Sequence, residues 1–351
     1  LRQRKIAAGY TMEELELILH PMVDEAKEST GSMGDDTPIA ILSDKYRPLS
    51  HFFRQKFSQV TNPPIDSIRE QSRMSLKTRF GNLRDVLDSN SYQESVFVMD
   101  SPVVTNSIFN KMLKFGKDES VTIDCCFPVK DTALKENIKR IQDEAEAAVL
   151  SGKQHIVLTD MNADSDNVSV PMILATAAVH SSLTRKGIRS FISLHIQSAE
   201  CLDTHYFAVL IGVGATTVNP YLAQECIRER HSKGLFGDYS YEECVARFKK
   251  AVDQGLLKIM AKLGISVVSA YRGGFNFEVV GLSRSMVNEY FLGVQSRISG
   301  IGLSGIEHKI KELHKYAFSG DVATLPIGGI YRYRNGGEAH AYDGKLIHLL
   351  Q

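Results

Sequence analysis

The sequence contains no tryptophan, only five cysteines and no excess of either charge. Its 41 Lys+Arg balance 41 Asp+Glu, so it lacks the basic field that attracts nucleic acid or an anionic membrane. No run approaches the ~18 consecutive apolar residues of a transmembrane helix, which excludes a membrane span. The cysteines are too few and scattered for a disulfide scaffold, and their odd number fits a reducing cytosol. We therefore expect a cytoplasmic protein.

What is present is a globular composition. Over 351 residues, 43% are hydrophobic and 23% charged, which is enough core for one large domain or two ordinary ones. The chain begins at Leu1, and LRQRK leads into a helix rather than an apolar signal segment. The C-terminal segment IGGIYRYRNGGEAHAYDGKLIHLLQ is aromatic and glycine-rich, without a core of its own. We interpret the sequence as a piece of a longer protein, with its end leading into a further domain.

The N-terminal part is expected to be helical with polar loops. A capping box, Thr11-x-x-Glu14, opens a helix that Pro21 should kink. Its apolar residues recur at helical spacing, at Leu15, Ile18, Leu19, Met22 and Val23. A short strand is expected at 39–42, and two short helices around 49–57 and 66–74.

From about residue 95, apolar runs alternate with amphipathic helices. The runs expected to be strands are SVFVM, VTIDCCFP, HIVLTD, RSFISLHI, YFAVLIGV, ISVVSAY and FEVVGL. A second capping box, at Ser240 and Glu243, opens a helix that Gly255 should split and Gly264 should end. Apolar strands separated by helices predict a parallel sheet covered on both faces. The fold class is α/β, either a complete or incomplete (β/α) barrel or an open doubly wound sheet.

Two motifs resemble known sites but lack an essential part. Gly212-Val213-Gly214 could begin a dinucleotide fingerprint, but Thr217 stands where the third glycine belongs, which favours a tight turn between strands. The run Asp160-x-Asn162-x-Asp164-x-Asp166 resembles a calcium loop without its glycine and its final glutamate. We expect these acids to cap the helix 171–186 instead.

Two further groups of residues have both a chemical and a structural interpretation. Cys125 and Cys126 have no CxxC partner, and in a strand they should point to opposite faces, with at least one in the core. His195 and His205 flank a loop that contains Glu200, at the carboxyl end of a predicted strand. Barrel enzymes place their catalytic groups there, so an acid/base pair is one hypothesis and structural hydrogen bonding the other.

Two polar runs, residues 59–66 and 74–82, are not explained by packing. Composition alone predicts surface loops. They contain side chains suited to hydrogen bonding, namely Thr61, Asn62, Ser75, Lys77, Thr78 and Arg79.

These runs also belong to a series of longer segments. In order, the segments are GYTMEELELILHPM, GSMGDDTPIAILS, RPLSHFFRQKFSQVTNPPIDSIRE, MSLKTRFGNL, GVGATTVNPYLAQE, GLLKIMAKLGISVVSAYRGGFNFEVVGL and SRISGIGLSGIE. Together they resemble the central domain of the glutamate synthase large subunit. The resemblance extends from Gly9 to Gln351 and is loosest over about residues 85–150.

The resemblance implies a parent enzyme that makes two L-glutamate from L-glutamine and 2-oxoglutarate. In that family an amidotransferase domain hydrolyses glutamine with an N-terminal cysteine. Ammonia then passes through an internal tunnel to a barrel that holds FMN and a 3Fe-4S cluster. The central domain connects the two and is similar to a rudimentary version of the FMN-binding barrel. A small electron-donating subunit is a further possible partner.

For this chain the resemblance implies no catalytic, cofactor-binding or metal-binding residues of its own. It divides the chain into an N-terminal helical and polar-loop part (1–85), a β/α body (86–322) and a linker (323–351) into the FMN domain. The tunnel or inter-domain candidates are the six side chains of the polar runs. Two alternatives stay open: an independent barrel enzyme with a site near His195, Glu200 and His205, and a purely mechanical spacer.

Overall fold

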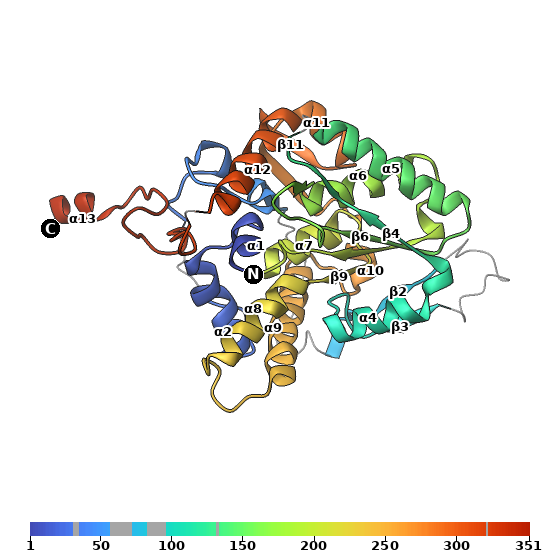
Figure 1. Cartoon of the computed structure of the whole chain (residues 1–351), viewed down its shortest axis with the longest axis horizontal. Coiled ribbons are helices and arrows are strands. Elements are labelled where there is room, and N and C mark those ends of the chain that lie inside the picture. The colour runs from blue at the N-terminus through green and yellow to red at the C-terminus, as the bar shows by residue number, and fades with distance from the viewer. Residues whose placement is uncertain (31–34, 57–71, 83–95, 131–132, 321) are drawn as a thin grey trace.

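The computed structural model describes residues 1–30, 35–56, 72–82, 96–130, 133–320 and 322–351. At its centre lies a parallel sheet with the strand order β4-β6-β8-β9 (Figure 1). These strands are β4 (Ser120–Asp124), β6 (His155–Thr159), β8 (Ser193–Gln197) and β9 (Thr217–Asn219). The register aligns Ser120 with His155 and His155 with Ser193, so the first residues of three strands are level.

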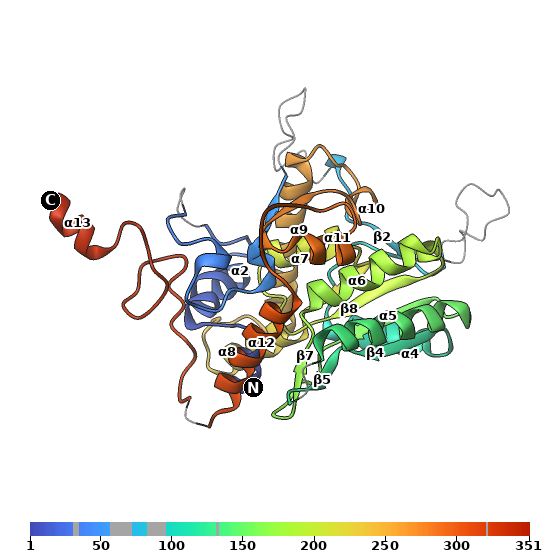
Figure 2. The same cartoon turned by 90° about the horizontal axis from the view of Figure 1, so that it is seen from above.

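One face of this sheet is apolar and is covered by the helices that connect its strands. The helices are α5 (Leu134–Leu150), α6 (Met172–Arg185) and α7 (Thr204–Gly212), accompanied by the short elements β5 (Cys126–Pro128), β7 (Asn167–Ser169) and η6 (Arg189–Phe191). Ile156, Leu194 and Val218 alternate with the residues of the other face and belong to the main core. In Figure 2, α5 and α6 lie side by side, as their mutual contacts require.

The opposite face is covered by other elements. They are α4 (Asn106–Phe115), the antiparallel pair β2 (Thr78–Phe80) and β3 (Phe97–Met99), and the turn η5 (Lys117–Glu119). A second, smaller core forms here from Val104, Phe109 and Val157. Strands β6, β8 and β9 are therefore covered on both faces, as the sequence predicts, whereas the edge strand β4 is exposed at Thr122. Only one of the two covers consists of connecting helices.

The described strands form an open sheet and not a closed barrel. At one edge, Val104 N–H donates to the Val218 carbonyl oxygen (2.9 Å), and Val218 N–H donates to that of Pro102 (2.8 Å). Residues 102–104 therefore lie beside β9 and pair with it through an isolated parallel bridge. At the other edge, the described residues give β4 only β6 as a partner. The α/β class and the parallel sheet are confirmed, and the barrel is at most partial.

A second sheet packs beside the first, in the order β1-β10-β11. Its strands are β1 (Phe53–Gln55), β10 (Phe277–Leu282) and β11 (Gln295–Ile301), with β1 antiparallel and β11 parallel to β10. The helices in this part of the chain are α8 (Tyr221–Ser232), α9 (Tyr241–Lys262), α10 (Val268–Tyr271), α11 (Arg284–Tyr290) and α12 (Leu303–Phe318).

The N-terminal elements pack onto the second half of the chain. They are α1 (Arg2–Ala7), the π-helix η1 (Glu14–Leu19), α2 (His20–Asp24), and the 3₁₀ turns η2 (Ala40–Leu42) and η3 (Leu49–Phe52). Helix α1 contacts α12, and α2 contacts α9. The C-terminal helix α13 (Gly344–Leu350) stands away from the body in both views (Figures 1 and 2).

Both capping boxes are confirmed. Thr11 N–H donates to Glu14 Oε2 (2.6 Å) and Glu14 N–H to Thr11 Oγ1 (3.3 Å), and Ser240 and Glu243 repeat the same exchange. Pro21 lies in the first turn of α2, where its missing N–H is not needed. The chain stays helical at the junction and changes there from π to α hydrogen bonding.

The expectation that YFAVLIGV is a strand is wrong, because this run lies in α7. Asp203 caps that helix by accepting from Tyr206 N–H (2.8 Å), and the residues from Tyr206 to Gly212 are all buried. A helix whose whole surface is apolar is enclosed by its neighbours on all sides. Its apolar residues then show no helical periodicity in the sequence, so the run cannot be distinguished from a buried strand.

Other expected boundaries also need correction. Residues 39–42 end in the 3₁₀ turn η2, and ISVVSAY contains the short helix α10. In the described part of the expected helix 49–57, the chain forms η3 and β1. Helix α9 runs unbroken through Gly255, whereas Gly264, at φ +70°, follows its last residues as predicted. The helix expected over 66–74 lies largely outside the described residues.

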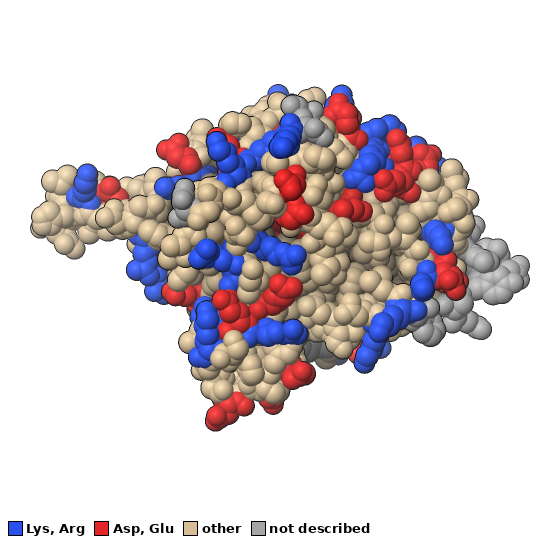
Figure 3. Space-filling model, in the orientation of Figure 1, with Lys and Arg blue, Asp and Glu red and all other residues tan. Residues whose placement is uncertain are grey.

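The surface carries both charges in mixture. On the face shown in Figure 3, lysines and arginines are interspersed with acidic residues. Helix α5 carries the ion pairs Lys139–Asp143 and Arg140–Glu144. Among the helices that the structure describes, none has the length and hydropathy needed to cross a bilayer.

Candidate functional site

The face of the central sheet that α4 covers is polar, although most of it is buried; on the edge strand β4, Thr122 is exposed. In a strand alternate side chains share a face, and the register places these rows together. The face is formed by Ser120, Thr122, Asp124, His155, Val157, Thr159, Ser193, His195, Gln197, Thr217 and Asn219. Strands of a covered parallel sheet are usually apolar on both sides. This face is therefore our candidate functional site.

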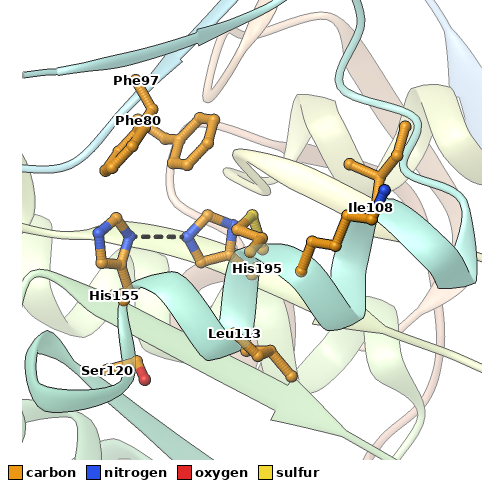
Figure 4. A pocket seen from close by; sticks show the side chains of 10 residues that line it. Phe80, Phe97, Ile108, Leu113, Ser120, His155 and His195 are labelled. Carbon is orange, nitrogen blue, oxygen red and sulfur yellow. Dashed lines mark hydrogen bonds between the residues drawn. The ribbon is translucent and has the colours of Figure 1, made fainter.

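A row of three side chains crosses the sheet near its amino end. His155 Nδ1 lies 3.1 Å from His195 Nε2, and His195 Nδ1 lies 2.7 Å from Thr217 Oγ1. His155 is 6% exposed, and His195 and Thr217 are fully buried. Figure 4 shows the two imidazoles edge to edge, with the hydrogen bond between them.

Both histidines are neutral at pH 7. Burial lowers the pKa of His155, and burial together with the positive charges near it holds the pKa of His195 well below its usual value. A neutral imidazole has one N–H donor and one acceptor nitrogen. The row is therefore a chain of uncharged hydrogen bonds.

A second polar row lies nearer the carboxyl ends of the strands. Thr159 Oγ1 donates to Gln197 Oε1 (2.9 Å), and Asn219 Nδ2 donates to Asn106 Oδ1 (2.8 Å) on α4. The Asn106 backbone N–H donates in turn to Gln224 Oε1 (2.8 Å). This row joins the first residue of α4 to the sheet.

Between α4 and the histidine row lies a cavity of about 260 Å³ (Figure 4). Phe80 and Phe97 stack at one side with ring centroids 5.3 Å apart, and Phe80 lies 5.9 Å from His155 and 5.6 Å from His195. The cavity is lined by Phe80, Phe97, Ile108, Lys111, Met112, Leu113, Gly116, Ser120, His155 and His195. Its wall is apolar except for the histidine row and the ends of a few polar side chains.

The predicted run 74–82 packs against this site. Ser75 N–H donates to the Ser266 carbonyl oxygen (2.8 Å), and Thr78, 1% exposed, donates to that of Leu76 (3.0 Å). Phe80 enters the cavity wall.

On the other face of the same run, Lys77 and Arg79 are exposed. The other two candidates, Thr61 and Asn62, lie outside the described residues. The expectation of a surface loop therefore holds for only half of the side chains in 74–82, because alternate residues of β2 are buried.

The acid/base residues of the barrel-enzyme alternative have separate partners. His195 bonds to its two neighbours in the row, whereas the His205 Nε2 atom lies 3.0 Å from the Ser50 carbonyl oxygen. Glu200 accepts from Met172 N–H (3.0 Å) and from the Tyr206 hydroxyl. The sequence does not predict that His155 and Thr217 bond to His195. The signal was a histidine in each of two neighbouring β runs.

The acidic loop does not cap α6, contrary to expectation. Glu200 takes that role through Met172 N–H, while Asp160 accepts from Ala199 N–H at 2.8 Å. Burial and the nearby Glu200 raise the pKa of Asp160 to about 7. Nowhere in the described part of the chain do three His, Cys, Asp or Glu side chains meet as metal ligands would.

The glycine and cysteine motifs have structural roles. Gly214, at φ +117°, turns the chain from α7 into β9, so the turn joins a helix to a strand rather than two strands. A Cβ there would lie 2.3 Å from His180 Cγ. Cys125 is buried and Cys126 partly exposed, both as free thiols, which fits opposite faces.

Known structures give only a weak likeness. The flavin-binding domain of baker's yeast flavocytochrome b2 is 8% identical, with a TM-score of 0.39, over 77% of this chain and 88% of that chain. A mandelate oxidase variant is 10% identical, with a TM-score of 0.28, over 79% and 97%. Scores this low carry no information about the chemistry of this chain.

Sequence comparison is decisive. The family model of the glutamate synthase central domain matches residues 3–283. The chain is 56% identical over 353 residues to the glutamate synthase [NADPH] large chain of Azospirillum brasilense, and 38% identical over 354 residues to that of Bacillus subtilis. Each match covers 100% of this chain and 23% of the relative. This chain therefore belongs to the glutamate synthase central domain family.

Proposed function

We propose that this chain is the connecting domain of a glutamate synthase and carries no catalytic residues of its own. It would join the glutamine amidotransferase domain to a domain with FMN and a 3Fe-4S cluster. The whole enzyme would form two L-glutamate from L-glutamine and 2-oxoglutarate in the cytoplasm. The observation that supports this is the family match over residues 3–283 in a chain that spans 23% of the Azospirillum relative.

Within that domain we propose that the runs 59–66 and 74–82 face the FMN domain and contribute to the ammonia passage. The alternation in β2 supports this for the second run, since Phe80 contacts the two histidines of the sheet and Thr78 is buried, while Lys77 and Arg79 stay exposed. Exposed polar side chains on an anchored strand suit contact with a neighbouring domain. The boundaries 1–85, 86–322 and 323–351 remain predictions.

The electron source is a separate question. The relatives include an NADPH enzyme and a ferredoxin-dependent enzyme, the latter from Pyropia yezoensis and 39% identical over 365 residues. A small electron-donating subunit is thus a proposed partner of the whole enzyme.

The test of a tunnel role is made in the full enzyme. Thr78→Ala removes the buried hydroxyl that bonds to Leu76 and fixes the shape of the run. This variant and Asn62→Ala should uncouple glutamine hydrolysis from glutamate formation, because ammonia would escape before reduction. Thr78→Ser, which keeps the hydroxyl, should stay coupled. One-to-one coupling in both alanine variants would favour the mechanical spacer.

The independent-enzyme alternative has its own test. The purified chain is incubated with excess FMN and desalted, and its absorption spectrum is recorded. We expect no retained flavin. Stoichiometric retention would mean that this chain contains a functional flavin site. The independent barrel enzyme would then be favoured over the connecting domain.

A further inference from the structure

In the cavity beside α4, one edge of the His155 imidazole is available to bind a ligand. His155 uses Nδ1 for His195, and its Nε2 has no hydrogen bond to any described residue. A Cβ built on Gly116, which also lines the cavity, would lie 3.5 Å from His155 Cδ2 and 3.9 Å from Nε2. The Cδ2–Nε2 edge thus borders the cavity.

Thr217, at the buried end of the histidine row, determines which atom donates in each hydrogen bond of the row. Thr217 is fully buried, and within the described residues its hydroxyl bonds only to His195 Nδ1. A buried hydroxyl without an acceptor costs about 1–3 kcal/mol, so Thr217 donates to Nδ1. His195 then carries its proton on Nε2 and donates to His155 Nδ1. His155 consequently carries its own proton on Nε2, as a donor at the cavity.

The rest of the wall determines the kind of ligand. Phe80, Phe97, Ile108, Met112 and Leu113 present rings and aliphatic carbons. A dry cavity of about 150 Å³ can hold benzene, so about 260 Å³ holds one ring with a substituent. Aromatic rings also favour the edge-to-face contacts that Phe80 already makes with both histidines.

The charge of the ligand follows from its surroundings. Both histidines are neutral, and the Lys111 side chain is exposed, so its ammonium group keeps its water shell. An anion beside the histidine row would exchange its water for uncharged partners, which costs free energy.

We propose that this cavity binds a small uncharged molecule with one aromatic ring and one hydrogen-bond acceptor, which accepts from His155 Nε2–H. The site is independent of the tunnel hypothesis, because it rests only on the histidine row and the apolar wall.

The test is a fluorine NMR titration of the 351-residue chain with two probes of one shape. One is 4-fluoroacetophenone, and the other is 4-fluoro-α-methylstyrene, in which a CH₂ group replaces the carbonyl oxygen. We expect the ketone to bind about fivefold more tightly, the effect of one neutral hydrogen bond. Equal affinities, or no binding of either at millimolar concentration, would overturn the proposal. Tighter binding of the anion 4-fluorobenzoate than of the ketone would overturn the proposal that the ligand is uncharged.

Two further measurements separate the hydrogen bond from a general effect on packing. His155→Phe keeps a ring in the wall and should bind both probes equally, whereas His308→Phe, on the exposed side of α12, should keep the preference. Imidazole nitrogen shifts in the unmodified chain should show both protons on Nε2. A proton on Nδ1 of His155 would refute the donor at the cavity, whatever the probes do.

Discussion

Gly81 and Ser193 exchange two hydrogen bonds, although 112 residues separate them. Gly81 N–H donates to Ser193 Oγ (2.9 Å), and the Ser193 hydroxyl donates back to the Gly81 carbonyl oxygen (3.1 Å). Ser193 is the first residue of β8 and 2% exposed. One hydroxyl therefore attaches the end of the polar run 74–82 to the central sheet.

Ser193→Ala should destabilise this attachment. Both polar groups of Gly81 would lose their partner in a buried place, at a cost of about 1–3 kcal/mol. Urea unfolding should show the loss, and hydrogen exchange should quicken most at residues 78–81. Ser232→Ala on α8, where the hydroxyl is exposed, is the control and should change the stability by less than about 0.5 kcal/mol. Unchanged exchange at 78–81 would contradict the attachment.

The sequence predicts correctly those features of the fold that a few neighbouring residues determine. The capping boxes at Thr11 and Ser240 and the strand HIVLTD are confirmed because neighbouring residues determine them. The helix α7 was missed because a fully apolar run has no period. The pairing of His155 with His195 depends on the register of two strands, which no local pattern encodes.

The candidate residues illustrate the same limit. The prediction of Ser75, Lys77, Thr78 and Arg79 rests on polarity and on the family resemblance of their run, neither of which shows burial. In the structure Thr78 is buried, Ser75 partly buried, and Lys77 and Arg79 exposed. Their alternation would have been visible only if 78–80 had been recognised as a strand, and a three-residue strand is too short to show a pattern. The cavity draws on six separate segments, so its existence is a property of the packed chain.

Asp160 should make the protein less stable as the pH rises from about 4 to about 7. Its pKa is about 7 in the folded chain, against 3.8 for an ordinary aspartate, so the folded state holds this proton more strongly. Its stabilising contribution is complete below pH ~4 and is lost as the pH passes 7, by at most about 1.4 kcal/mol per pH unit. Asp160→Asn cannot ionise and should flatten this slope by about one proton.

The measurement is urea unfolding of both proteins at several pH values between 4 and 8. Asp166→Asn removes an exposed carboxylate from the same loop and should leave the slope as it is. If Asp160→Asn behaved like that control, Asp160 would ionise at its ordinary pKa and the prediction would be wrong.

Glu13 should hold the segment 330–332 against the N-terminal helices. Its carboxylate is 6% exposed and accepts from the N–H groups of Ile330 (2.6 Å), Tyr331 (3.2 Å) and Arg332 (2.9 Å). Hydrogen bonds to a charged group contribute about 1.5–3 kcal/mol each, and the three share one carboxylate. Glu13→Ala should release this segment, seen as faster exchange of those three amides. Glu16→Ala, exposed on the same helix, should not. Equal protection in both variants would refute the role of Glu13.

Gly255 lies inside α9, where alanine would normally stabilise a helix by about 1 kcal/mol. Here a Cβ would lie 2.5 Å from Thr204 Cγ2 and 2.8 Å from Thr204 Oγ1, because α9 crosses close to α7. We expect the overlap to outweigh the helix propensity, so that Gly255→Ala destabilises by about 1–3 kcal/mol.

A double-mutant cycle shows whether the close approach is the cause. Thr204→Ala removes the two atoms that would lie within 3.0 Å of a Cβ at Gly255 and leaves only the Thr204 Cβ, at 3.2 Å, so it should restore most of the stability that Gly255→Ala loses. The Thr204 hydroxyl is buried without a partner among the described residues, so the single change should cost little. Additive effects, or a stabilising Gly255→Ala alone, would mean that α7 and α9 lie further apart than this. In that case the close approach of α9 to α7 would not require a glycine at position 255.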